Sequence, residues 1–332
     1  MTPRFSVIVL LDRNQLEPCL SSLLGQTGPA FEVIAVVNPG RSLPAHPHLR
    51  SLAEADRNPA RRRNRAAALA AGEILAFLDD DAAAPADWLA KADCLFQAHP
   101  ELAGLGGPNL APRECPFPEW LSEVILSTPF LGSGNPTYRA DGSARPARPG
   151  DIHLCNFLVR RECFQQLHGF NEGLGYGAED SEFIYLGQRR RGYGFGFFPE
   201  LTVTHRRRPF GPSYLRQRFR LRRQNGKLLW VYPDMYGKNP SLRAGLLLVP
   251  LFAVSVWLAP VLLPAWALLY LTAVWALSWK RAAERPWALP LISLAFLLHH
   301  LTYALGLGFG WLEGLLQGPR QLRDRLGRFM QP

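Results

Sequence analysis

The chain has 332 residues, enough for about two domains that each bury a core of their own. Hydrophobic residues make up 48% of the chain and charged residues 19%, which excludes a disordered, collagen-like or coiled-coil protein. The net charge is +10, and twelve lysines and arginines against one glutamate fall between Gln188 and Lys227. A strip this basic predicts an anionic partner such as lipid headgroups, pyrophosphate or nucleic acid.

The cysteines and the N-terminal residues indicate a reducing compartment. The five cysteines are odd in number and form no CxxC pair, which argues against a secreted disulfide framework and against a zinc cage. The apolar run Phe5–Leu11 is too short for the core of a signal peptide, and no plausible cleavage site follows it. We therefore expect these residues to face a reducing cytosol, with nothing that directs export.

The first 240 residues follow an α/β pattern. In chain order we expect strands at 5–11 and 31–37 around a helix at 16–24, then a helix at 61–71, a strand at 73–78 and a helix at 85–98. After Pro/Gly-rich loops, we expect a strand at 152–159 and helices at 161–167 and 178–190. This order predicts a Rossmann-like domain with a mostly parallel sheet.

Two uncharged runs follow, at residues 244–278 and 287–312. The first would form a helix of about 52 Å, longer than a hydrocarbon core of about 30 Å. Because Pro250, Pro260 and Pro264 interrupt it, we expect a membrane hairpin over 244–279 that bends at 259–264. The second run predicts a spanning or re-entrant segment; the alternative is two buried helices of a soluble domain.

Charge near these runs predicts their orientation. The connector 280–285 and the tail 320–328 both carry net positive charge, which favours the cytoplasmic side and an even number of crossings. We therefore divide the chain into a domain at 1–235 and a C-terminal membrane-associated helical region at 236–332 that ends in a basic tail. The expected location is the cytoplasmic membrane, with the first domain on its cytoplasmic face.

Two acidic clusters carry the chemistry. Asp79, Asp80 and Asp81 directly follow an apolar strand, where an open parallel sheet forms its ligand crevice. Three adjacent carboxylates repel one another unless a cation is present, and their oxygens suit Mg²⁺ or Mn²⁺. Glu179 and Asp180 follow a Gly-rich loop and begin a helix. The alternative interpretations are a capping turn for the first cluster and a helix-dipole complement for the second.

Taken in their order along the chain, these motifs resemble those of the family 2 glycosyltransferases with the GT-A fold. The segments that carry the resemblance are FSVIVLL, CLSSLLGQT, FEVIAVV, ARRRNRAAALAAGEILAFLDDDAAAPADWL, NFLVRRECFQQLHGFNEGLGYGAEDSEF and VTHRRR. The membrane-bound layout, which ends in HHLTYALGLGFGWLEG, is similar to succinoglycan-type enzymes that build exopolysaccharide repeat units on lipid carriers.

The resemblance implies a nucleotide-sugar donor, a divalent cation and inversion at the anomeric carbon. Asp79 is then expected near the donor ribose and within reach of the metal. Asp81 is the implied ligand of the Mg²⁺ or Mn²⁺ that bridges the diphosphate, and Asp80 is the second choice. His205 matches a position that supplies a further metal ligand or touches the diphosphate, although a lone histidine after a strand is commonly structural.

The same resemblance implies the remaining roles. Asp180 would be the base that removes the proton from the acceptor hydroxyl, and Glu179 would support it or bind acceptor. Arg63 and Asn64 match a segment on the donor side, where a guanidinium can bind phosphate or carboxylate with two hydrogen bonds.

Three segments depart from the family pattern. Leu10–Arg13 stands where a Pro-Thr-Tyr-Asn-like turn is usual, and Val37–Gly40 where an Asp-Asp pair is common. We expect Asn38, or Asp12 from the neighbouring strand, to contact the donor base instead. Gln217–Leu221 has leucine where the processive QxxRW motif has tryptophan, which predicts transfer of a single sugar.

The sequence thus predicts transfer of one sugar from a UDP-, GDP- or TDP-sugar to a membrane-linked, polyprenyl-pyrophosphate-linked saccharide in exopolysaccharide or glycoconjugate assembly. The arginines expected at the acceptor's lipid phosphate are Arg206, Arg207, Arg208, Arg216, Arg220 and Arg223. The alternatives are direct transfer to polyprenyl phosphate or a glycerolipid, and a non-catalytic membrane-tethered binding protein with a decayed donor site. Nucleic acid is not the expected partner, because it leaves the acidic triplet unexplained. The sugar, the base and the oligomeric state stay open.

Overall fold

The computed structural model describes residues 2–12, 17–132, 135–140, 142–174, 177–236, 251 and 253–318. The chain divides into two compact units. What we call the first unit contains residues 1–113 and 136–206, and the second unit contains residues 114–135 and 207–323. Residues 114–135 therefore pack with the C-terminal helices although the chain around them belongs to the first unit.

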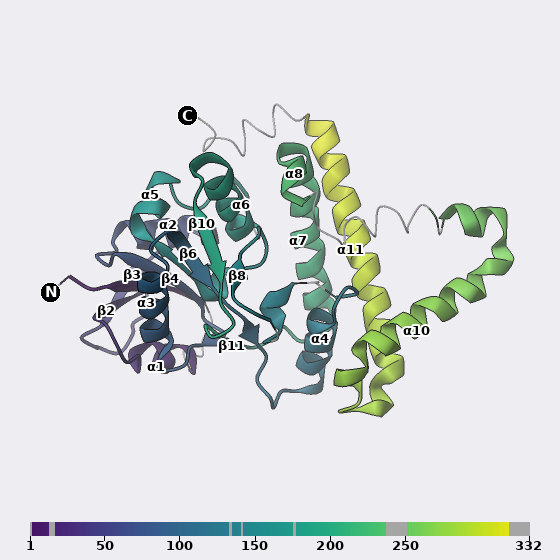
Figure 1. Cartoon of the computed structure of the whole chain (residues 1–332), viewed down its shortest axis with the longest axis horizontal. Coiled ribbons are helices and arrows are strands. Elements are labelled where there is room, and N and C mark those ends of the chain that lie inside the picture. The colour runs from purple at the N-terminus through teal and green to yellow at the C-terminus, as the bar shows by residue number, and fades with distance from the viewer. Residues whose placement is uncertain are drawn as a thin grey trace. The chain divides into compact units, whose positions relative to one another are not determined.

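An eight-stranded sheet forms the centre of the first unit, in the order β3-β2-β1-β4-β9-β6-β10-β8 (Figure 1). Strand β1 pairs in parallel with β2 and β4, whereas β9 is antiparallel to both β4 and β6. The predicted α/β class is confirmed, and the sheet is mixed. The strands are β1 (Phe5–Leu11), β2 (Phe31–Val37), β3 (Leu49–Ala53), β4 (Ile74–Asp79), β6 (Leu102–Gly106), β8 (Arg145–Pro146), β9 (Phe157–Arg160) and β10 (Gly194–Phe197).

Helices cover both faces of this sheet because its strands alternate their apolar side chains between two cores. Val7 and Val9 of β1 pack with helices α1 and α3, while Ile8 and Leu10 pack with α2, α5 and α6. These helices are α1 (Cys19–Leu24), α2 (Pro59–Ala68), α3 (Trp88–Ala98), α5 (Arg161–Gln166) and α6 (Glu179–Leu186). A π-helical turn, Gly187–Arg191, extends α6.

A second, three-stranded sheet has the order β5-β11-β7. It consists of β5 (Ala82–Ala83), β7 (Asn109–Leu110) and β11 (Val203–His205). β11 pairs antiparallel with β5 directly after the end of β4. This small sheet therefore connects the carboxyl end of the central strand β4 to a segment more than a hundred residues later in the chain.

The second unit is helical. In the described part of this unit, the α-helices include α4 (Phe117–Ser127), α7 (Pro212–Val231), α8 (Pro233–Tyr236), α10 (Leu263–Ala282) and α11 (Leu289–Gln317). The segments Pro260–Ala282 and Pro286–Gln317 are long and apolar enough to cross a membrane, by length and composition, and they fit a membrane-associated region. A short 3-10 turn at Pro260–Leu262 lies within the expected bend. Residues 244–250 and 252 of the predicted hairpin, and the basic tail, lie outside the described residues.

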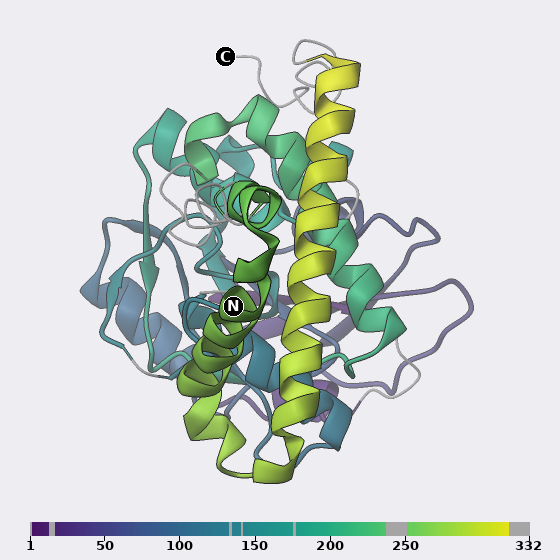
Figure 2. The same cartoon turned by 90° about the vertical axis from the view of Figure 1, so that its right-hand side faces the viewer.

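Helices α7 and α11 lie side by side in close contact (Figures 1 and 2). A Cβ on Gly310 would stand 1.9 Å from the Arg223 carbonyl oxygen, and one on Gly226 would stand 2.3 Å from the carbonyl oxygen of α11's Leu307. Glu313 of α11 pairs with Arg223 and, at 2.8 Å, with Lys227. The basic helix is thus held against the longest apolar helix by glycine packing and by ion pairs.

Candidate active site

The candidate site lies at the carboxyl ends of β1, β2 and β4. Asp79 is the last residue of β4 and pairs in register with Leu10 of β1, while Leu11 pairs with Val37 of β2. Asp12 and Asn38 follow those last two residues and therefore lie at the same edge of the sheet. The strand order reverses between β1 and β4, and ligands bind at such switch points in open α/β sheets.

One arginine joins the two acidic clusters of the sequence. Arg63, on α2, donates from Nη2 to Asp79 Oδ1 at 2.9 Å and from Nη1 to Glu179 Oε1 at 3.3 Å. Arg63 and Glu179 are both buried, each with 7% exposure. The end of β4 and the start of α6 therefore form one site, held by a shared counter-ion. The structure favours this bridging role for Arg63 over the predicted donor contact.

Asp81 lies beside His205 because β5 pairs with β11. Ala82 is the register partner of His205, and the preceding residue, Asp81, accepts a main-chain hydrogen bond from Arg206 N at 3.0 Å. The His205 Nε2 atom lies 3.0 Å from Asp81 Oδ1. Two of the three residues expected to bind the metal are thus in contact, although the sequence separates them widely.

A group of possible metal ligands surrounds this point. One ligand atom each from Asp79, Cys155 and His205 lie within 4.8 Å of one another. Carboxylate, imidazole and thiolate are all ligands of divalent cations, so these residues fit such an ion. Sequence reasoning missed Cys155, because a single cysteine outside any CxxC spacing carries no local signal of metal binding.

Glu179 and Asp180 begin α6 after two residues with positive φ, Gly177 at 84° and Ala178 at 73°. Asp180 Oδ1 accepts from Ser181 N at 2.6 Å and from Ser181 Oγ at 3.1 Å. Burial raises the pKa of Glu179 to about 7, with the Asp180 carboxylate acting in the same direction and Arg63 opposing it. Burial likewise raises the pKa of Asp180. Both carboxyl groups therefore hold protons more tightly than they would in water.

Asp12 and Asp80 are tied to each other and to a buried arginine. Asp12 N donates to Asp80 Oδ2 at 3.0 Å, and the Asp12 carboxylate accepts from Arg62 Nη1 at 2.5 Å. Arg62 is 2% exposed and also donates to Val36 O. Asn38 is exposed beside this group. The sequence did not single out Arg62, since three consecutive arginines on a helix give no sign of which one points inward.

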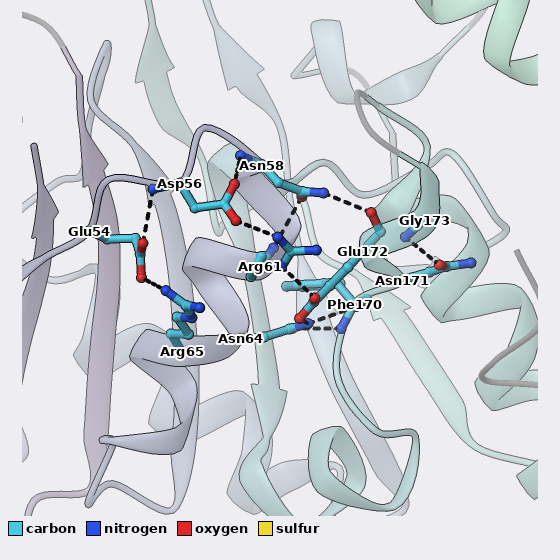
Figure 3. Close-up of polar contacts among 10 residues, drawn as sticks. All are labelled: Glu54, Asp56, Asn58, Arg61, Asn64, Arg65, Phe170, Asn171, Glu172 and Gly173. Atoms are coloured by element: carbon cyan, nitrogen blue, oxygen red, sulfur yellow. Dashed lines mark hydrogen bonds and ion pairs between the residues drawn. The ribbon is translucent and has the colours of Figure 1, made fainter. Parts of the chain in front are cut away.

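Asn64 faces a different part of the chain, as Figure 3 shows. Its side chain donates to Phe170 O and accepts from Phe170 N, both at 2.8 Å. Arg61 and Asn58 bind the side chain and the main chain of Glu172 in the same network. These contacts fix α2 to the segment that leads into α6. The structure therefore favours a positioning role for Asn64 over the predicted donor contact.

The arginines predicted at the acceptor phosphate differ in exposure. Arg207 is buried and its Nε donates to Glu123 Oε2 at 2.5 Å, and Arg223 is paired with Glu313. The structure thus favours roles within the second unit for these two side chains. The exposed members of the set are Arg206, Arg208, Arg216, Arg220 and Arg223.

Comparison with known proteins gives one family match and several structures of similar fold. Residues 7–167 match the model of the family described as Glycosyl transferase family 2. Among solved structures, the mannosyltransferase PcManGT from Pyrobaculum calidifontis, in complex with GDP-Man and Mn²⁺, aligns with a TM-score of 0.59 at 22% identity. The alignment covers 92% of this chain and 88% of that one.

TarS 1-349 from S. aureus aligns with a TM-score of 0.46 at 14% identity. The alignment covers 94% of this chain and 92% of that one, and a score this low carries no argument. No curated protein matches the chain. The family match covers just under half of the chain, and the likeness to the P. calidifontis structure shows the fold alone.

Proposed function

We propose that the chain is an inverting, metal-dependent glycosyltransferase that moves one sugar from a nucleotide-sugar to a lipid-linked saccharide during exopolysaccharide or glycoconjugate assembly. The observation that carries this proposal is the Arg63 bridge, which brings the acidic end of β4 and the acidic start of α6 into one site. The proposed reaction is attack by an acceptor hydroxyl on a sugar that is linked to a diphosphate. Such a reaction requires a donor-binding cluster and a base close to each other.

In this proposal Asp81, His205 and Asp79 would hold the divalent cation, Mg²⁺ or Mn²⁺. When bound, such a cation neutralises the negative charge that develops on the leaving nucleoside diphosphate. The complex of the P. calidifontis enzyme with GDP-Man and Mn²⁺ is consistent with that choice.

Asp180 is the proposed base. It removes the proton from the acceptor hydroxyl as that oxygen attacks the anomeric carbon from the side opposite the leaving group, which inverts the configuration. Its raised pKa makes it a stronger proton acceptor than a carboxylate in water. Arg63 balances the charge of Glu179 next to it and keeps that charge from opposing the approach of the diphosphate.

Asp12 and Asn38 are the proposed contacts of the donor base. Both follow strands at the switch point, and the Asp12 carboxylate is oriented by Arg62. A carboxylate and an amide at this place accept hydrogen bonds from the N–H groups of uracil, thymine or guanine. Asp79 is then placed for the ribose, one strand away, with Asp80 held by the Asp12 main chain.

The exposed apolar surface of the C-terminal helices supports a lipid-linked acceptor. Helices α10 and α11 leave large apolar side chains exposed, among them Leu268 at 68%, Trp279 at 60% and Leu316 at 84%. Exposed apolar surface on this scale marks a protein or membrane contact. We propose the cytoplasmic membrane, with the first unit on its cytoplasmic face, helices α10 and α11 in contact with lipid, and Arg206, Arg208, Arg216 and Arg220 at lipid phosphate.

Turnover by the full chain in detergent tests the proposal. We expect transfer from one of a panel of UDP-, GDP- and TDP-sugars into a bacterial lipid extract, dependent on Mg²⁺ or Mn²⁺ and abolished by chelator. The mass of the product distinguishes extension of a lipid-linked saccharide from direct transfer to polyprenyl phosphate or a glycerolipid. Equal product with and without chelator would refute the metal requirement.

Asp180→Asn is expected to lower turnover by about 10²- to 10⁴-fold while the donor still raises the melting temperature. Asp87→Asn, which changes an exposed aspartate paired with Lys91, is the matched control and should retain turnover. Normal turnover of Asp180→Asn would exclude it as the base. Absence of a thermal shift with every donor would instead indicate a decayed donor site.

A further inference from the structure

We propose that Cys155 is a ligand of the cation at this site and makes the site bind borderline-soft ions such as Zn²⁺ and Co²⁺ more tightly than Mg²⁺. The inference rests on the proposed function, because it concerns the same cation. It adds a ligand that the acidic motifs do not include, and with it a selectivity among metals.

The geometry brings the thiol to the centre of the site. Cys155 lies in a 3-10 turn, Leu154–Asn156, and is 4% exposed. Its Sγ, a carboxylate oxygen of Asp79 and a ring nitrogen of His205 are all within 4.8 Å of one another. Bonds of about 2.3 Å to sulfur and about 2.1 Å to nitrogen place two ligands of one ion roughly 3.5–4 Å apart, so a single ion fits with small side-chain movements.

The neighbouring Asn156 fixes the turn that carries the thiol. Asn156 is fully buried, accepts from Trp88 Nε1 at 3.0 Å, and donates to Pro108 O at 3.1 Å and to Leu201 O. Leu201 lies just before β11, the strand that ends at His205. The thiol and the imidazole are therefore held by connected segments rather than by independent loops.

The set of ligands determines which metals bind well. A site with oxygen ligands alone suits Mg²⁺, whereas imidazole and thiolate favour Zn²⁺ and Co²⁺, and the general affinity order places both above Mn²⁺. Binding requires the thiolate, so the thiol proton leaves to water as the metal enters. Asp81, 3.0 Å from His205 Nε2, is placed either to complete the ligand set or to orient the imidazole.

Spectroscopic titration with Co²⁺ tests this inference apart from catalysis. In tag-free full chain in detergent, we expect one equivalent of Co²⁺ to produce a near-ultraviolet thiolate-to-cobalt absorption band that Zn²⁺ displaces and equimolar Mg²⁺ does not. Cys155→Ser should lose the band and bind Co²⁺ at least about tenfold more weakly, with its Mg²⁺ affinity little changed. Cys94→Ser, an exposed cysteine on α3, is the matched control and should keep the band.

The outcomes separate this inference from the proposed function. Binding of Co²⁺ to the wild-type chain without a thiolate band would overturn the role of Cys155 and leave the donor cation site intact. If neither Co²⁺ nor Mn²⁺ binds, by calorimetry, both proposals fail. A wild-type spectrum without the band overturns the role of Cys155 even when Cys155→Ser does not fold, because that result needs no variant.

Discussion

Arg63 is the residue on which the arrangement of the site depends most. Replacing it by methionine leaves Glu179 buried without its counter-ion and Asp79 without its partner. Breaking a buried ion pair in this way costs about 3 kcal/mol. We expect Arg63→Met to lower the free energy of unfolding by that amount in urea titrations. Arg63→Lys keeps the positive charge but cannot donate to both carboxylates at once, so it should lower the free energy of unfolding by less.

The control for Arg63 stands on the same helix. Arg65 is half exposed and pairs with Glu54. Since pairs at the surface contribute at most about 1 kcal/mol, Arg65→Met should change the free energy of unfolding little. Equal losses for Arg63→Met and Arg65→Met would show that the bridge does not stabilise the site.

The backbone before Glu179 and Asp180, the proposed catalytic pair, is strained at one non-glycine residue. Ala178 has φ 73°, a conformation that costs an L-residue about 1 kcal/mol and that glycine adopts freely. Ala178→Gly should therefore raise the melting temperature, and Gly177→Ala, at φ 84°, should lower it. Differential scanning calorimetry of the two variants should give shifts of opposite sign, and shifts of equal sign would contradict strain at Ala178.

Glu179 predicts a pH dependence of stability. Its pKa is about 7 in the folded chain against an ordinary value of 4.5, so the unfolded chain loses this proton first as the pH rises. The stabilising contribution is complete below the ordinary pKa and is lost as the pH rises through about 7. We expect Glu179→Gln to melt higher than the wild type at pH 8, by a margin that shrinks toward pH 5.

The exposed Glu200→Gln serves as the control for that comparison. Its melting temperature should differ from the wild type by an amount that barely varies with pH. A Glu179→Gln difference that stays constant from pH 5 to pH 8 would contradict the raised pKa.

At the scale of elements, the contact between α7 and α11 leaves no room for a side chain. Gly310→Val would place a Cβ against the Arg223 main chain and is expected to separate the helices, lowering the melting temperature in detergent by several degrees. Gly308, on the same helix, has open space around it, so Gly308→Ala should stabilise α11 by up to about 1 kcal/mol through helix propensity. Similar losses for both variants would argue against the close packing.

Strands with strong apolar alternation could be predicted from the sequence, and the others could not. Residues Phe5–Leu11 and Phe31–Val37 form strands over the predicted bounds, because β-branched and large apolar side chains fill both cores there. β6 and β10 contain two glycines each, and β3 is half exposed, so none showed a clear period. The strand expected from residue 152 begins at Phe157, because the residues before it form the turn that carries Cys155.

The acidic motifs of the site were visible in the sequence because each follows a recognisable element. The directions of the α2 side chains were not, since neighbouring helical residues point to different sides. Arg62 and Arg63 point into the site, whereas Asn64 binds the loop at Phe170. Only tertiary contacts distinguish these roles. The same holds for Cys155, which precedes β9 and comes close to Asp79 because β9 pairs antiparallel with β4.

At the scale of the whole molecule, we expect the chain to bind lipid vesicles. Leu268→Asp with Leu316→Asp, which places charges on exposed apolar side chains, should reduce flotation with both neutral and anionic vesicles. Arg216→Gln with Arg220→Gln should reduce only the binding to anionic vesicles, by about fivefold for each arginine at low salt. Unchanged flotation of the aspartate variant would contradict membrane association through these helices.

The glycine contact between α7 and α11 also limits how deeply the second unit can enter lipid. Guanidinium groups on α7 must stay level with water or phosphate, because transfer of a cation into hydrocarbon is costly. Because α11 is packed along α7, it cannot enter the hydrocarbon more deeply than the α7 arginines allow. The half of α11 beyond His299 is therefore expected to lie at the depth of the lipid headgroups. The packed pair of α7 and α11 would then fix how deeply the second unit enters the bilayer.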